Sequence, residues 1–91
     1  MRHLLTTRRH VPLDRADDYL VAWETVRLAV QRTGGQAWIF RGAAHEDQFM
    51  EFIEWSDETT APTEDGTVAA TRTQLDAFAV PGATEEWEDA Q

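Results

Sequence analysis

The 91-residue sequence predicts an α+β fold with the element order β-α-β-β-α-β and one four-stranded antiparallel sheet. Two stretches carry this prediction. Residues 49–55 are largely apolar on both faces when they are taken alternately, which indicates a strand covered on both sides. Residues 14–33 place apolar side chains at helical spacing. A chain of this length forms a single domain, so residues 1–91 are treated as one unit.

The composition excludes several classes of function. Cysteine is absent, which rules out disulfides, thiolate nucleophiles and cysteine metal sites. The net charge is −9, and residues 42–91 hold thirteen of the seventeen acidic residues. Because nucleic acids and anionic membranes attract basic surfaces, we predict neither as a partner. Residues 1–10 lack the apolar core of a signal peptide, and no stretch approaches the roughly 20 apolar residues of a membrane span, so a cytoplasmic protein is expected.

The first strand is predicted over residues 2–11, where β-branched residues favour a strand. Alternation gives one face with Leu4, Thr6, Arg8 and His10, and an opposite face with Leu5, Thr7, Arg9 and Val11. Pro12 ends this strand because it has no N–H to donate to a sheet.

The first helix is predicted over residues 14–33. Its apolar stripe is Ala16, Tyr19, Leu20, Trp23, Val26, Arg27 and Val30. Asp14 is the expected N-cap, and the pair Gly34-Gly35 stops the helix. Val21, Leu28 and Ala29 widen the apolar surface, so this helix is expected to be well covered.

The rest of the chain supplies a hairpin, a loop, a short helix and a last strand. Strands over residues 36–42 and 49–55 are joined by the polar connection 43–47 and form the hairpin. Residues 56–66 form a loop in which one helical turn is possible on composition. Residues 67–78 fit a second helix, with Val68, Arg72 or Thr71, Leu75 and Phe78 on one side, and residues 83–88 fit a closing strand around Trp87.

This order corresponds to the ferredoxin-like arrangement, and right-handed crossovers give the strand order 4-1-3-2. The first strand then lies between the third and the fourth. Arg8 and Arg9 are expected near Glu51 or Glu54 on one side and near Glu85, Glu86 or Glu88 on the other. The alternative is that these are unrelated solvated charges.

Two helices cover one face of such a sheet, yet the central hairpin is apolar on both faces. An uncovered apolar face marks an interaction site, and its simplest cover is a second copy of the chain. We therefore predict a homodimer that forms through the sheet face.

At this point the sequence resembles the dimeric α/β barrel superfamily, whose members pair two ferredoxin-like sheets into one barrel. The resemblance rests on the element order, the length, the strand 49–55 with its following Ser56-Asp57, and the closing Glu86-Trp87-Glu88. It implies similarity to antibiotic-biosynthesis type monooxygenases, which act without a cofactor, and to their haem-degrading relatives. Trp55-Ser56-Asp57 looks like the Trp-x-Asp that ends the third strand in many of these proteins. The chain departs from their pattern at Ile53, where they often have Glu, and in a second helix without His.

The candidate ligand pocket lies between the helices and the sheet. Its candidate residues are Tyr19, Trp23, Trp38, Arg41, Glu51 and Trp55. Glu51 needs a partner among its apolar neighbours, and an arginine of the first strand or Arg41 can supply one. The alternatives are that the aromatic residues form plain core and that Glu51 is a catalytic base with a raised pKa.

The histidines offer little chemistry. His45 stands beside Glu46 and Asp47 in the hairpin connection, where a solvated turn is favoured over a metal site. His3 and His10 lie at opposite ends and on opposite faces of the first strand, so they cannot act as a pair. We predict no metal and no cofactor.

Two functional hypotheses remain. The first is a dimeric barrel that binds a small apolar or aromatic molecule, or that acts only as an assembly partner. The second is a cofactor-independent monooxygenase acting on an aromatic substrate. A filled interior favours the first, and a polar group inside an aromatic cavity favours the second.

Overall fold

The computed structural model describes residues 1–79 and 81–91 and has the predicted order of elements. The strands and α-helices are β1 (Arg2–His10), α1 (Ala16–Arg32), β2 (Gln36–Arg41), β3 (Gln48–Ser56), α2 (Gly66–Gln74) and β4 (Pro81–Glu88). Short 3-10 turns cover Leu13–Arg15, Pro62–Glu64 and Leu75–Ala77, and the second of these lies in the loop where a helical turn was predicted. Within the described ranges, no helix is long and apolar enough to cross a membrane.

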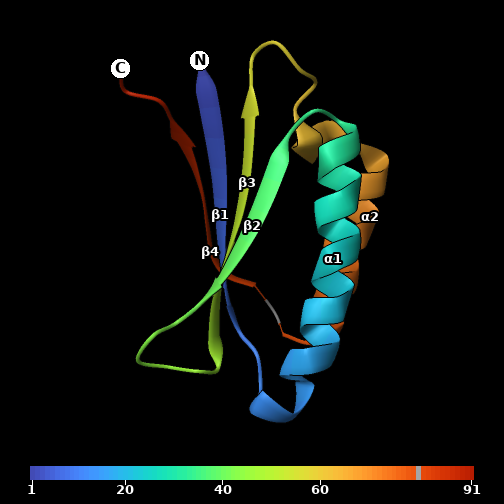
Figure 1. Cartoon of the computed structure of the whole chain (residues 1–91), viewed down its shortest axis with the longest axis vertical. Helices are drawn as coiled ribbons and strands as arrows, with labels where there is room; N and C mark the ends of the chain where they lie inside the picture. The colour runs from blue at the N-terminus through green and yellow to red at the C-terminus, as the bar shows by residue number, and fades with distance from the viewer. Residues whose placement is uncertain (80) are drawn as a thin grey trace.

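The four strands form one antiparallel sheet in the order β2-β3-β1-β4, which confirms the predicted 4-1-3-2 order. Both helices lie on the same side of the sheet, and the opposite side is bare (Figure 1). The Cα atoms span 39 × 28 × 16 Å, as expected for one helical layer on one sheet. The predicted ferredoxin-like α+β fold is therefore confirmed.

The core fills the space between α1, α2 and the inner face of the sheet. Its apolar residues are Leu5, Val11, Ala16, Tyr19, Trp23, Val26, Ala29, Val30, Ala37, Phe49, Ile53, Val68 and Leu75. The stripe predicted for α1 is thus largely the buried one. Of the three residues expected to widen this stripe, Ala29 is buried as predicted, whereas the cover expected for Val21 and Leu28 is wrong, because they are 74% and 44% exposed.

The N-terminus of α1 differs from the prediction, whereas α2 has a side-chain N-cap. Asp14 does not cap α1, since it lies within the preceding 3-10 turn and the N-cap position is Arg15, without a side-chain hydrogen bond. In α2, by contrast, the side chain of Asp65 accepts hydrogen bonds from the backbone N–H groups of Thr67 and Val68. The predicted stop after α1 is present, with Gly34 in the left-handed region at φ 90°.

The bare side of the sheet, which we call the open face, is defined by the strand register. Thr6 of β1 and Trp38 of β2 both pair with Phe52 of β3, so all three side chains lie on this face. The large apolar residues of the open face are Leu4, Trp38, Phe40, Met50, Phe52 and Trp87. Phe40 and Phe52 meet edge to face with ring centroids 5.5 Å apart, and Phe40 and Trp87 remain 61% and 53% exposed. The predicted two-sided apolar hairpin is present, and one of its sides has no cover from residues 1–79 and 81–91.

Candidate functional site

The charged centre of the molecule is a buried network between the helices and the inner face of the sheet. Arg9 of β1 donates from Nε to Oε2 of Glu51 on β3 at 2.7 Å, and the hydroxyl of Tyr19 on α1 donates to the same oxygen at 2.6 Å. Arg9 also donates from Nη1 to Oδ1 of Asp76 at 2.9 Å and to the carbonyl of Ala79 at 2.8 Å. Arg9, Glu51 and Tyr19 are each less than 5% exposed. The network joins β1, β3, α1 and the segment after α2.

The ionisation of this network is set mainly by burial. Burial raises the pKa of Glu51, while the hydrogen bond from Tyr19 and the charge of Arg9 act in the opposite direction. Burial also raises the pKa of the Tyr19 phenol, and the nearby charge of Glu51 adds to this effect. Tyr19 therefore stays a neutral donor, and its proton points to Glu51.

These contacts show which arginine is the partner of Glu51. The structural ion pair with an arginine of the first strand is confirmed, and the partner is Arg9. Arg41, the other proposed partner, instead has its guanidinium carbon 4.8 Å from the ring centre of Phe49. The expected pairing of Arg8 and Arg9 with the acidic residues of β4 is wrong, because Glu85, Glu86 and Glu88 lie opposite Thr6, Leu5 and His3.

The six candidate pocket residues do not surround one cavity. Tyr19 and Glu51 are in contact, and Trp23 is 3% exposed in the core. Trp38 lies on the open face, on the other side of the sheet. In the interior that was predicted to hold a ligand, Tyr19 packs edge to face on both Phe49 and Phe78.

Trp55 lies at the far end of β3, in a second small cluster. The ring of His3 stacks on Trp55 with centroids 5.4 Å apart, and Nε2 of His3 is 2.5 Å from Oδ1 of Asp57. The hydrogen bond with His3 lowers the pKa of Asp57. As predicted, His3 and His10 lie on opposite faces of β1, since His3 pairs with Trp55 and His10 with Gln48. In residues 1–79 and 81–91, no group of three or more His, Asp or Glu side chains is placed to hold a metal ion.

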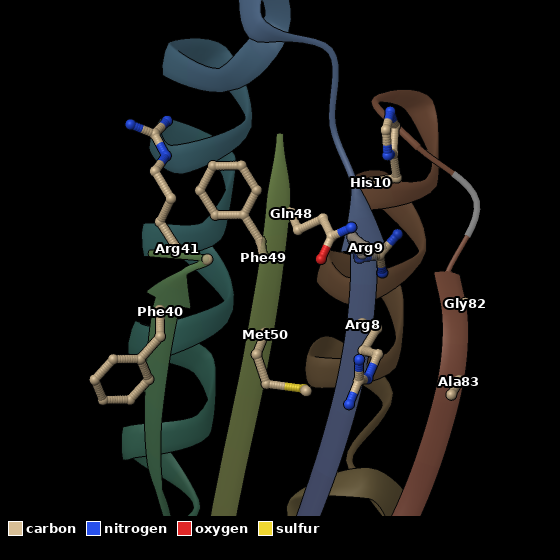
Figure 2. A pocket seen from close by; sticks show the side chains of 11 residues that line it. Arg8, Arg9, His10, Phe40, Arg41, Gln48, Phe49, Met50, Gly82 and Ala83 are labelled. Carbon is tan, nitrogen blue, oxygen red and sulfur yellow. The ribbon is translucent and has the colours of Figure 1, made fainter. Parts of the chain in front are cut away.

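A cavity of about 470 Å³ lies where the hairpin end of the sheet meets the start of β4. Its lining is Arg8, Arg9, His10, Phe40, Arg41, Gly42, Gln48, Phe49, Met50, Gly82 and Ala83. Figure 2 shows the side chains of Arg8, Met50 and Gln48 projecting from β1 and β3 on the side of the strands away from the helices. The volume is within the range of small-molecule sites. This cavity is the candidate site of the structure.

Of the residues that line this cavity, only Arg41 was among the pocket residues predicted from the sequence. The alternation of β1 did place Arg8 and His10 on one face, and the alternation of the hairpin placed Phe40 and Met50 on faces of their own strands. The missing information was the register, which pairs Arg8 with Met50 and Met50 with Phe40. The alternation within each strand shows which residues share a face, but it does not show which residues of neighbouring strands lie side by side.

Comparison with known proteins identifies the fold. No family model matches the chain, and no curated protein matches its sequence. Among solved structures, SnoaB from Streptomyces nogalater, a cofactor-independent oxygenase, superposes with a TM-score of 0.78 at 12% identity, over 99% of this chain and 94% of that one. The chain has the fold of this protein.

Two further structures give the same result. A conserved protein of unknown function from Bacteroides thetaiotaomicron matches with a TM-score of 0.78 at 15% identity, over 97% of both chains. A candidate antibiotic biosynthesis monooxygenase from Bordetella bronchiseptica matches with a TM-score of 0.76 at 11% identity, over 99% of this chain and 98% of that one. The resemblance stated from the sequence is thus confirmed for the fold of one chain, and at these identities the likeness concerns the fold alone.

We predict that Arg9→Met strongly destabilises the protein. The change leaves Glu51 buried with Tyr19 as its remaining hydrogen-bond donor, and breaking a buried pair in this way costs about 3–5 kcal/mol. Arg8→Met, one residue away and exposed, serves as the matched control and should change the free energy of unfolding by about 0.5 kcal/mol or less. Urea unfolding followed by tryptophan fluorescence measures both. Equal effects of the two substitutions would show that the network adds nothing to stability.

We also predict a pH dependence that belongs to Glu51. Since its pKa is raised in the folded protein, the folded state binds this proton more tightly than the unfolded chain does. The stability contributed by Glu51 is therefore fully present below its unfolded pKa of about 4.3 and decreases as pH rises through the folded pKa. The measurement is the difference in unfolding free energy between wild type and Glu51→Gln from pH 4 to pH 8. This difference should shift against the wild type as pH rises, and a shift in the opposite direction would mean that Arg9 outweighs burial.

Proposed function

We propose that the protein forms a homodimer through its open face and binds a small apolar or aromatic molecule in the cavity beside that face. The observation that supports this function is the position of the cavity. Phe40 and Met50 belong both to its lining and to the apolar surface that the chain leaves uncovered. A ligand there would contact aromatic and thioether surface on one side and polar groups on the other, which is typical of small-molecule sites.

The homodimer is supported by the chemistry of the open face. Trp38, Phe40 and Trp87 are each more than a third exposed and lie on the same face of the sheet. Phe52 pairs with Trp38 and packs edge to face on Phe40. Patches of this kind mark interaction sites, and a second identical sheet is a self-complementary cover. Two sheets packed face to face lie about 10 Å apart, which leaves room for the interdigitation of these rings.

A cofactor-independent monooxygenase is the second candidate, because SnoaB, which has the same fold, is such an oxygenase. We place an aromatic substrate in the open-face cavity as well, because Tyr19 packs edge to face on both Phe49 and Phe78 between the helices and the sheet. The two candidates therefore share a site and differ in whether the bound molecule reacts.

We predict that Trp38→Asp abolishes the dimer. The substitution places a carboxylate at the apolar open face without touching the cavity lining, so desolvating it would oppose association. Val21→Asp, on the exposed side of α1, is the control that adds the same charge elsewhere. Analytical ultracentrifugation at micromolar concentration should give twice the chain mass of 10.4 kDa for wild type and Val21→Asp, and the monomer mass for Trp38→Asp. A monomeric wild type would contradict the proposed assembly.

We predict that the wild-type protein binds naphthalenemethanol, a neutral two-ring probe, and that Ala83→Trp prevents it. The indole would fill the cavity from β4, where Ala83 is exposed, whereas Ala70→Trp adds the same ring on the outer surface of α2 and should bind normally. Isothermal titration calorimetry measures the affinity. Absence of binding to wild type, or equal binding to both variants, would overturn the proposed site.

The recovered probe distinguishes the two candidate functions. After incubation under air without added cofactor, a binding protein returns the probe at its original mass. In a cofactor-independent monooxygenation the probe itself supplies the two electrons and two protons that turn the second atom of O2 into water, so a monooxygenase returns the probe with one oxygen atom gained and two hydrogen atoms lost.

A further inference from the structure

We propose that the cavity selects aromatic molecules that carry a carboxylate, and that Arg8 is the residue that binds this group. This inference rests on the proposed binding function and adds the chemical class of the ligand. It starts from the charge of the lining. Three arginines, one histidine and one glutamine line the cavity, and no Asp or Glu does, although the whole chain has seventeen acidic residues and a net charge of −9.

The three arginines differ in how far their charge is already neutralised. Arg9 is directed to the helix side, where Glu51 and Asp76 accept its hydrogen bonds. Arg41 pairs in register with Phe49 and lies over that ring on the same inner side. Arg8 is the arginine of the set that projects from the open face, and among the described residues it has no carboxylate within 4.0 Å.

His10, the other basic group of the lining, already has an acidic neighbour. Its Nε2 is 3.2 Å from Oδ2 of Asp47, at the edge of the hairpin connection. The positive charge available to a ligand on the open face is therefore concentrated at Arg8.

The backbone around Arg8 explains why a cavity forms there. Thr7 pairs with Thr84 and Arg9 pairs with Pro81, so a register shift leaves Gly82 and Ala83 opposite Arg8 alone. Bulges of this kind locally interrupt a ladder and redirect side chains. The residues across from Arg8 are small, and a Cβ added at Gly82 would lie 3.8 Å from the Cβ of Arg8. Space beside the guanidinium is thus provided by the sequence of β4.

The residues around Arg8 offer contacts for both parts of an aromatic carboxylate, the ring and the charged group. Its cross-strand neighbour is Met50, which in turn pairs with Phe40, so apolar surface begins directly beside the guanidinium. A planar ring can lie on this surface while a carboxylate reaches the two parallel N–H donors of the arginine. A neutral aromatic molecule would use the first contact and leave the second unmade.

Covering the open face in a dimer increases the need of Arg8 for a negatively charged partner. A charge removed from water must be paired, because an isolated buried ion is costly. If a second copy covers the open face, Arg8 needs a counter-ion on that face. Its own chain places Glu54 and Glu85 farther along, opposite Leu4 and Thr6, so a ligand carboxylate is the partner that the cavity can admit.

The test compares naphthoate with naphthalenemethanol by calorimetry on the full-length protein. The two probes share the rings and differ in the charged group. Wild type should bind naphthoate at least about tenfold more tightly, as expected for one charge-assisted pair, and added salt should reduce this ratio. Arg8→Gln should bring the ratio close to one, and Arg8→Lys should retain part of the preference.

Arg32→Gln is the matched control, because it removes one exposed arginine from the end of α1, outside the cavity lining. It should keep the full preference for naphthoate. A urea unfolding midpoint equal to that of wild type shows that Arg8→Gln is folded.

Four outcomes would overturn the inference. Equal affinity of wild type for the two probes removes the selectivity and leaves the proposed binding function standing. A preference that survives in Arg8→Gln assigns the carboxylate to another group. Weakened dimerisation of Arg8→Gln with an unchanged preference means that an acidic residue of the second copy is the partner of Arg8. Binding of neither probe would overturn the proposed function together with this inference.

Discussion

Two helices are too few to cover both faces of a four-stranded sheet, and the features of this protein that bear on function follow from that shortage. The helices pack on the inner face, where Leu5, Ile53 and Phe49 enter the core. The open face keeps its rings in contact with solvent, with Phe40 the most exposed of those on the hairpin. Burying this surface would contribute on the order of 25 cal/mol for each Å² removed from water. The chain therefore carries a driving force for association that its own fold does not use.

The inner face is closed by a polar network instead of a ligand. Arg9, Glu51 and Tyr19 are each less than 5% exposed and hydrogen-bond to one another, and every buried side-chain nitrogen and oxygen in the described residues has a partner. A group with its hydrogen bonds already made has little left to offer a substrate. The raised pKa of Glu51 has a structural cause in burial, so it is weak evidence for catalysis here. The chemistry that remains open to small molecules lies on the other side of the sheet.

Much of the fold could be predicted from the sequence because its local signals agree with one another. The spacing of Tyr19, Trp23 and Val26 gave the buried stripe of α1, and the alternation of β1 separated Arg8 from Arg9 correctly. The order of elements then constrained the sheet, and with it the approach of Arg9 to Glu51. Local pattern and topology were sufficient for these features.

The site depended on information that alternation does not contain. Trp38 and Ile39 are both apolar, so their strand could have turned either side to the helices, and the structure places Ala37 and Ile39 inward. Trp38 therefore lies on the open face and not in the predicted pocket. The cap at Asp14 failed for a related reason, because a 3-10 turn displaced the start of the helix by two residues. The cavity itself depends on the register shift at Arg8, and neither composition nor period indicates such a shift.

The proposed assembly and the proposed ligand are coupled through the surface they share. A second copy on the open face would turn a cavity that is now exposed to solvent into an enclosed one, since Phe40 and Met50 belong to both surfaces. Enclosure strengthens the interaction of Arg8 with an anion, because the effective dielectric constant falls, and it also raises the cost of leaving Arg8 unpaired. A ligand that supplies the counter-charge would consequently favour the dimer, and by mutual linkage the dimer would favour the ligand. Under this proposal Arg8, which would be a defect in a purely hydrophobic interface, is the residue that couples assembly to ligand recognition.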